Sequence, residues 1–270
     1  MILTVSHVTT YHYAAPVRGA VQSLRLTPSR TDGQRTASWM LQVEGGTKGG
    51  SFRDGAGDWI ESWSVRGPIS ELRVRVEGTV ETTDMAGILR GHREHVSPSA
   101  YLRETEATVA DTALLTLARD AADGASGGLD LAHRLSTAVS ERIAYRPGVT
   151  EAHTTAAEAL ALGEGVCQDH AHALIAMARA QGLPARYASG YLFADASGAP
   201  HEAAHAWAEV WVDGLGWIGF DPANRCCPDD RYIRLGSGLD ARDAAPIRGV
   251  AVGAATESLN VEVAVRAQQQ

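Results

Sequence analysis

Residues 205–221, HAWAEVWVDGLGWIGFD, carry two apolar runs on either side of the turn-forming residues 213–216, DGLG. The alternation on each side predicts two antiparallel strands joined by a tight turn. A two-residue turn at Asp213-Gly214 would pair Ala206 with Asp221, one residue from His205. A four-residue loop would pair Asp221 with Ala208 instead, further away. The hairpin therefore predicts an imidazole–carboxylate contact that depends on the turn.

Upstream of this hairpin, residues 163–181, GEGVCQDHAHALIAMARAQ, read as a glycine-flanked turn followed by an apolar helix that ends at Gly182 and Pro184. Cys167 lies at or beside the first helical turn. Free amides and the helix dipole there stabilise a thiolate, and the same amides can hold an oxyanion. Cys167 is therefore the predicted nucleophile, with His205 as its base and Asp221 orienting the imidazole.

The rest of the chain divides into a β-rich part and a mixed part, so the predicted fold class is α+β. A β-sandwich-like N-terminal domain is expected at 1–83, because residues such as Leu72, Val74 and Val76 alternate with charged neighbours. A connection follows at 84–103. The core is expected at 104–270, with helices first and then an antiparallel sheet. Its helices are predicted near 109–122, 129–143 and 155–162, and its further strands at 187–193 and 259–265, the last being the final strand of the chain. Thr155 and Glu158 form a candidate capping box at the third helix.

Composition limits the function classes. The chain has 270 residues, a formal charge of -8 and 44% hydrophobic residues, as in an ordinary globular protein. The acidic balance argues against a nucleic-acid or anionic-membrane binder. No apolar run is long enough for a membrane span, no secretory signal is visible, and three cysteines make a disulfide framework unlikely. A cytoplasmic location is therefore expected.

Three motifs in this order resemble those of bacterial transglutaminase-like proteins, in the transglutaminase and papain-like thiol enzyme superfamily. They are GVCQDHAH at 165–172, HAWAEV at 205–210 and GWIGFDP at 216–222. The resemblance also covers the β-rich first domain that many members carry. It implies a papain-like core with a Cys167–His205–Asp221 triad and no cofactor. The chain departs from the family's third motif at Ala223, where Thr is usual.

Other assignments for the same residues are weaker. A zinc site could be drawn from Cys167, His170, His172, His201, His205, Cys226 and Cys227, but their spacing is not a usual one for zinc. His170 and His172 lie two residues apart and do not share a helix face. One of them lining the cleft is an alternative, but a helix-surface role is favoured for them. Trp207 and Trp211 share strand parity with His205 and either wall a cleft or pack in the core. No metal ligand is predicted.

The sequence thus predicts a thiol-dependent acyl-transfer enzyme that forms a thioester on Cys167. Its expected substrate is a peptide, a protein or a small amide, with neither nucleic acid nor membrane as a partner. Hydrolysis, as in a cysteine protease, is favoured over transamidation because nothing in the sequence guarantees exclusion of water. A non-catalytic protein-interaction module is the remaining alternative.

Overall fold

The structure is a computed structural model that describes residues 1–193, 204–253 and 256–267. The N-terminal part consists of strands β1 (Ile2–Leu24), β2 (Gln34–Val43), β3 (Gly46–Arg53) and β4 (Trp59–Thr82). The middle part carries the short 3₁₀ helices η1 (Pro98–Leu102) and η2 (Glu106–Thr108) and the α-helices α1 (Thr112–Ala122), α2 (Gly128–Arg142), α3 (Ala156–Leu162) and α4 (Cys167–Ala180). It also contains the two-residue strands β5 (Ala144–Tyr145) and β6 (Glu164–Gly165). The last part consists of β7 (Ala185–Leu192), β8 (Ala204–Val212), β9 (Gly216–Phe220), β10 (Tyr232–Gly238), β11 (Ile247–Ala251) and β12 (Glu257–Ala267).

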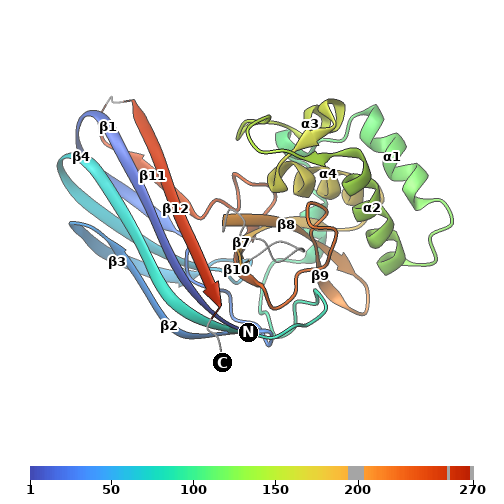
Figure 1. Cartoon of the computed structure of the whole chain (residues 1–270), viewed down its shortest axis with the longest axis horizontal. Coiled ribbons are helices and arrows are strands. Elements are labelled where there is room, and N and C mark those ends of the chain that lie inside the picture. The colour runs from blue at the N-terminus through green and yellow to red at the C-terminus, as the bar shows by residue number, and fades with distance from the viewer. Residues whose placement is uncertain (194–203, 254–255, 268–270) are drawn as a thin grey trace.

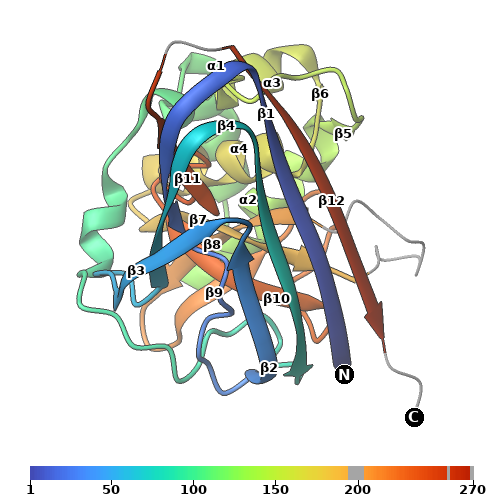
Figure 2. The same cartoon turned by 90° about the vertical axis from the view of Figure 1, so that its left-hand side faces the viewer.

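Two long strands, β1 and β4, build the N-terminal region by pairing along most of their length and bending together (Figures 1 and 2). The register of β1 against β4 shifts between His12 and Gly19, where the bend occurs. One half of β1 pairs with β12 and the other half with β11, while β4 takes β2 and β3 in the same way. The sandwich-like unit predicted from strand alternation is thus a single folded sheet.

The second sheet has the antiparallel order β10-β7-β8-β9. One face packs against α4, which the other helices surround, and the opposite face turns toward the N-terminal sheet (Figure 1). Alternation along the strands explains both contacts, since Ala206, Ala208 and Val210 of β8 join the helix-facing core. On the other side, Ile233 and Leu235 of β10 share a core with Leu3 of β1 and its neighbours. The two regions are therefore packed around continuous apolar contacts.

The predicted extent of the core differs from the structure at its C-terminal end. The sequence placed all of 104–270 in the core, but β11 and β12 pair with β1, from Leu24↔Ile247 to Leu3↔Ala267. The final strand was expected in the core's sheet and instead forms an edge of the N-terminal sheet. Its alternation indicates a half-exposed strand but carries no information about a partner more than 240 residues away.

The predicted helices lie close to the expected positions. At α3 the Thr155 amide donates to Glu158 Oε2 (2.8 Å) and the Glu158 amide donates to Thr155 Oγ1 (3.3 Å), so the capping box is present. The connection at 84–103 is not a loose linker, because the Leu89 amide donates to the Trp217 carbonyl and the Gly219 amide donates to the Gly87 carbonyl. Among the described residues, no helix combines the length and apolar character needed to cross a membrane.

Candidate active site

Cys167 is the first residue of α4, where its backbone amide is one of those left unpaired by the helix. Asp169 fixes this helix end: its Oδ2 accepts from the Val166 amide (2.8 Å) and from Thr150 Oγ1 (2.7 Å). Gly165, two residues before Cys167, has no room for a side chain, because a Cβ there would lie 2.8 Å from the Asp169 carboxylate. The GVCQD segment thus holds a half-buried thiol at a rigid helix start.

The two histidines of α4 do not lie on the protein surface, so the favoured surface role was wrong. His170 is buried with its ring nitrogens 2.9 Å from the Val166 carbonyl and 2.8 Å from the Ile143 carbonyl. His172 is also buried, and its Nε2 accepts from the Ala241 amide (3.0 Å). The reason is that α4 packs against the sheet, α1, α2 and α3 at once, which leaves it no solvent face. His201 lies outside the described residues.

His205 and Asp221 meet at the start of the β8–β9 hairpin, where His205 Nε2 donates to Asp221 Oδ2 over 2.6 Å. The connecting loop has three residues, since Val212 pairs with Gly216 and Ala208 with Phe220. Neither turn considered from the sequence is therefore present. Continuing this register places Asp221 opposite Trp207, on the same face as His205 and diagonal to it. A two-residue turn would have turned the carboxylate to the opposite face.

Asp221 is 1% exposed and holds three donors besides the imidazole. Tyr232 Oη donates to Asp221 Oδ2 (2.8 Å), Asn224 Nδ2 donates to the same oxygen (2.8 Å), and the Asn224 amide donates to Oδ1 (3.2 Å). We call His205, Asp221, Asn224 and Tyr232 the Asp221 cluster. Tyr232 was not singled out from the sequence because it lies on β10, which no motif marks.

The groups around His205 favour its protonated form. Burial opposes a positive charge on the imidazole, but hydrogen bonds to the Asp221 carboxylate and the Cys167 sulfur, together with their charges, raise the pKa of His205 to about 10. The pKa of Asp221 is lowered in turn: burial opposes its charge, and the hydrogen bond and charge of His205 outweigh that effect. The arrangement thus stabilises an imidazolium between a carboxylate and a sulfur.

The other two cysteines have a different environment. Cys226 Sγ lies 3.3 Å from Tyr232 Oη, and the backbone of Cys226 bridges to that of Asp221. Burial raises the pKa of the Cys226 thiol, and it raises the pKa of the Cys227 thiol to about 11. Both remain free thiols. Within residues 1–193, 204–253 and 256–267, no three His, Cys, Asp or Glu side chains gather as metal ligands would.

A second buried polar group lies further along β8, on the face shared by His205, Trp207 and Glu209. Glu209 accepts from Arg186 Nε and from Arg234 Nε, each over 2.6 Å. Arg234 also donates to Asp58 of the N-terminal region (2.9 Å), and Arg186 donates to Glu94 of the connection. We call these five residues the ion cluster. It ties both regions and the connection together.

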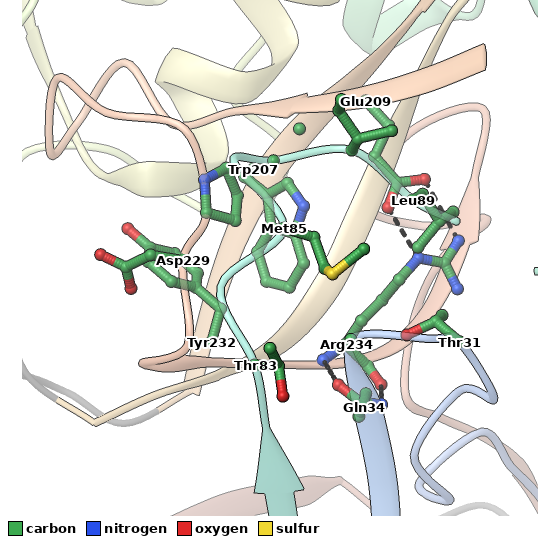
Figure 3. Close-up of a pocket in the computed structure, with 15 residues that line it drawn as sticks. Thr31, Gln34, Thr83, Met85, Leu89, Trp207, Glu209, Asp229, Tyr232 and Arg234 are labelled. Atoms are coloured by element: carbon green, nitrogen blue, oxygen red, sulfur yellow. Dashed lines mark hydrogen bonds and ion pairs between the residues drawn. The ribbon is translucent and has the colours of Figure 1, made fainter. Parts of the chain in front are cut away.

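Trp207 lies between the two clusters, next to Tyr232 of the Asp221 cluster. Their rings pack edge to face with centroids 5.5 Å apart, and Trp207 is buried. In Figure 3 they lie on one side of a cavity of about 70 Å³, with Glu209 and Arg234 on the other. Trp211 packs edge to face on Trp217 at 5.5 Å. Both tryptophans on β8 therefore pack against other aromatic rings, and Trp207 in addition borders this cavity.

Comparisons with known proteins match both regions of the chain. The model of the bacterial transglutaminase-like N-terminal region matches residues 3–81, and the model of the transglutaminase-like superfamily matches residues 115–222. An uncharacterized Mycobacterium leprae protein is 28% identical over 274 residues, covering 97% of this chain and 98% of that protein. A Mycobacterium tuberculosis protein is 40% identical over 77 residues, 25% of this chain and 24% of that protein.

A solved structure from Cytophaga hutchinsonii, described as "a putative cysteine protease", superposes with a TM-score of 0.75 at 22% identity. The match covers 100% of this chain and 92% of that one, so the two share a fold from end to end. The second matched region contains Cys167, His205 and Asp221. The chain belongs to the transglutaminase-like superfamily and begins with the bacterial transglutaminase-like N-terminal region.

Proposed function

We propose that the protein is a thiol-dependent acyl-transfer enzyme that hydrolyses amide bonds through a Cys167–His205–Asp221 triad. The observation that carries the proposal is the position of His205. Its Nε2 is fixed by Asp221 Oδ2 at 2.6 Å, and the Cys167 sulfur at the start of α4 contributes, together with Asp221, to the raised pKa of the same ring. This is the nucleophile–base–orienting group arrangement of covalent acyl transfer.

The reaction follows from the groups present. The Cys167 sulfur attacks the substrate carbonyl carbon and forms a C–S bond, and the carbonyl oxygen gains negative charge beside the Cys167 amide. His205 donates its proton to the leaving nitrogen as the C–N bond breaks, which leaves a thioester on Cys167. Water then loses a proton to His205 and attacks the thioester, releasing a carboxylic acid and restoring the ion pair. Asp221 keeps its charge throughout and orients the imidazole.

Hydrolysis is proposed over transamidation because Cys167 is only half-buried, so water can reach the thioester. An amine in place of water would give a new amide by the same steps. The expected location remains the cytoplasm, where a reduced Cys167 would persist.

Two assays test this proposal. Iodoacetamide should alkylate Cys167 far faster than Cys226 or Cys227, as read by peptide mapping of the partly labelled protein. Turnover of peptide, glutamine and ester substrates, with and without a fluorescent primary amine, should yield mainly the acid. Uniform alkylation of all three thiols would overturn the triad, and predominant incorporation of the amine would replace hydrolase by transamidase.

A further inference from the structure

A cavity of about 740 Å³ lies at the N-terminal end of α4. Four segments that are distant in the sequence form it: η2, the start of α3 with the residues before it, the first turns of α4, and the loop after β10. The side chains used below are Glu106, Glu158, Gln168, His172, Asp240 and Arg242.

The cavity adjoins Cys167. Gln168 follows the cysteine directly, and Gln168 and His172 are four residues apart, so they share one face of α4. Tyr187 connects the two places, since its ring lies 5.3 Å from the His172 ring. Burial raises the pKa of Tyr187 well above its usual value, with further increases from the charges of Cys167, Asp169 and Asp240. Cys167 is thus the neighbour in the chain of a residue in the cavity wall.

His172 carries a hydrogen-bond donor for which the described residues provide no acceptor. Its Nε2 accepts from the Ala241 amide, so the ring proton is on Nδ1, and burial lowers the pKa of His172 to about 4, which keeps the ring neutral. The side chain is 1% exposed and Nδ1 has no partner. An unpaired buried donor costs about 1–3 kcal/mol, which a carbonyl acceptor from a bound peptide would offset.

The charges around the cavity are predominantly negative. The cavity also includes the imidazole of His153, and its three carboxylates, those of Glu106, Glu158 and Asp240, face one guanidinium, that of Arg242. None of these four side chains takes part in an ion pair of the described residues. Asp240 is held in place because its Oδ1 accepts from the Asp243 amide (2.7 Å). The cavity thus carries negative charge that no ion pair neutralises, beside a buried imidazole donor that has no partner among the described residues.

We propose that this cavity is a substrate subsite that takes a lysine or arginine side chain, with His172 Nδ1 donating to a peptide carbonyl of the same substrate. The inference rests on the proposed function, because it assumes a peptide acylating Cys167. It names the substrate class as peptides that carry a basic residue next to the attacked carbonyl.

Peptide amides with a fluorogenic leaving group test the subsite, with Lys, the neutral analogue norleucine or Glu placed at the attacked residue or at either of the two residues before it. At one of these positions kcat/KM should be highest for Lys and lowest for Glu. Asp240→Asn keeps the acceptor for the Asp243 amide and should lower the Lys-to-norleucine ratio about threefold to fivefold, with a similar loss for Glu106→Gln. Arg242→Gln should raise the ratio, whereas Glu77→Gln on β4 is the matched control for a change of net charge alone and should leave it unchanged.

Binding to the Cys167→Ala variant, measured by calorimetry with the same peptides, separates this inference from the catalytic proposal. Tighter binding of the Lys peptide that weakens with Asp240→Asn supports the subsite even if no turnover is found. Equal binding and turnover of Lys and norleucine peptides at every position, or a preference for Glu, would overturn the subsite while fast alkylation of Cys167 still supports the triad.

Discussion

The Asp221 cluster and the ion cluster lie on the same face of β8, and both are almost entirely buried, yet they are built on opposite principles. In the ion cluster, Glu209 is held between two guanidinium groups whose protons do not leave: burial opposes the charges of Arg186 and Arg234, but Glu209 keeps both of their pKa values raised. In the Asp221 cluster, the cation is an imidazole that can give its proton away.

The difference shows how one strand separates stability from reactivity. The negative charge of Glu209 is balanced by a guanidinium on either side. Burial alone would raise the pKa of Glu209, but Arg234 and Arg186 outweigh this effect and lower the pKa to about 2. Asp221 meets one titratable donor and two neutral ones, Asn224 and Tyr232. Its charge therefore depends on His205, and a proton can move in the site without unpairing a fixed ion. The predictions below test this separation.

The largest expected effect is on chemistry alone. Cys167→Ala should lower turnover by about 10⁴-fold or more, because no other group can form the thioester. The melting temperature should stay within about 2 °C, since alanine fits the first turn of a helix. Cys226→Ser and Cys227→Ser are the matched controls and should retain turnover. A Cys167→Ala protein that still turns over substrate would show that the sulfur is not the nucleophile.

The next effect is on stability alone. Glu209→Gln leaves two buried guanidinium groups without their shared carboxylate and should cost about 3–5 kcal/mol of unfolding free energy, measured by urea denaturation. The control is Glu81→Gln, which breaks the exposed pair with Arg35 and should cost less than about 1 kcal/mol. Since the folded-state pKa of Glu209 is about 2, below its ordinary 4.5, the wild-type ion cluster stabilises the protein at neutral pH and loses this contribution only as the pH falls toward 2. Equal costs for the two variants would mean that the ion cluster is dispensable.

Asp221→Asn should have a smaller effect on rate than Cys167→Ala. The variant keeps the size and an oxygen acceptor but loses the charge that stabilises the imidazolium, so single-turnover acylation should fall by about 10²–10³-fold. His205→Ala should be more severe, because the proton then has no carrier. If both variants lost a similar and negligible part of their acylation rate, His205 and Asp221 would not assist the reaction of Cys167.

The pH profile sharpens the same comparison. Because the pKa of His205 is raised from 6.5 to about 10, the imidazolium and the stabilisation it brings are complete below pH 6.5 and lost as the pH rises through 10. Wild-type kcat/KM should therefore fall on the alkaline side near pH 10, and in Asp221→Asn this fall should move to lower pH. An unchanged alkaline limb in the variant would mean that Asp221 does not hold the proton on His205.

The smallest expected effect is that of Tyr232→Phe. Losing one hydrogen bond to the carboxylate should lower kcat roughly tenfold and shift the alkaline limb slightly downward, while KM stays constant. Tyr191→Phe, which removes a buried hydroxyl 2.7 Å from His7 at the contact between the two regions, is the matched control and should leave the pH profile unchanged. A change in KM alone for Tyr232→Phe would assign this tyrosine to substrate binding.

Local patterns predicted much of this molecule. The helix positions, the capping box at Thr155 and the start of α4 at Cys167 follow from periodicity and end signals that neighbouring residues carry. The loop of the β8–β9 hairpin did not follow, since Gly214 and Gly216 both adopt positive φ (82° and 88°), and either glycine can close a turn. The meeting of His205 with Asp221 was expected, but the face on which they meet depends on that loop.

Features that depend on distant partners were missed for a common reason. The ion cluster joins Asp58, Glu94 and Arg234, residues whose sequence neighbours give no sign of one another. Tyr232 reaches Asp221 only because β10 pairs with β7, next to β8. Such contacts are set by tertiary packing, which no local propensity records.

The pairing of β1 with β11 and β12 also sets an order of events during synthesis. β1 can pair with β4 as soon as residue 82 is made, but its other edge stays uncovered until residues 247–267 follow. At ~5–20 residues per second, that interval lasts roughly 10–40 s, during which an apolar strand edge is open to other chains. The helices and the second sheet are made within the same interval, so the nascent protein completes its first region last.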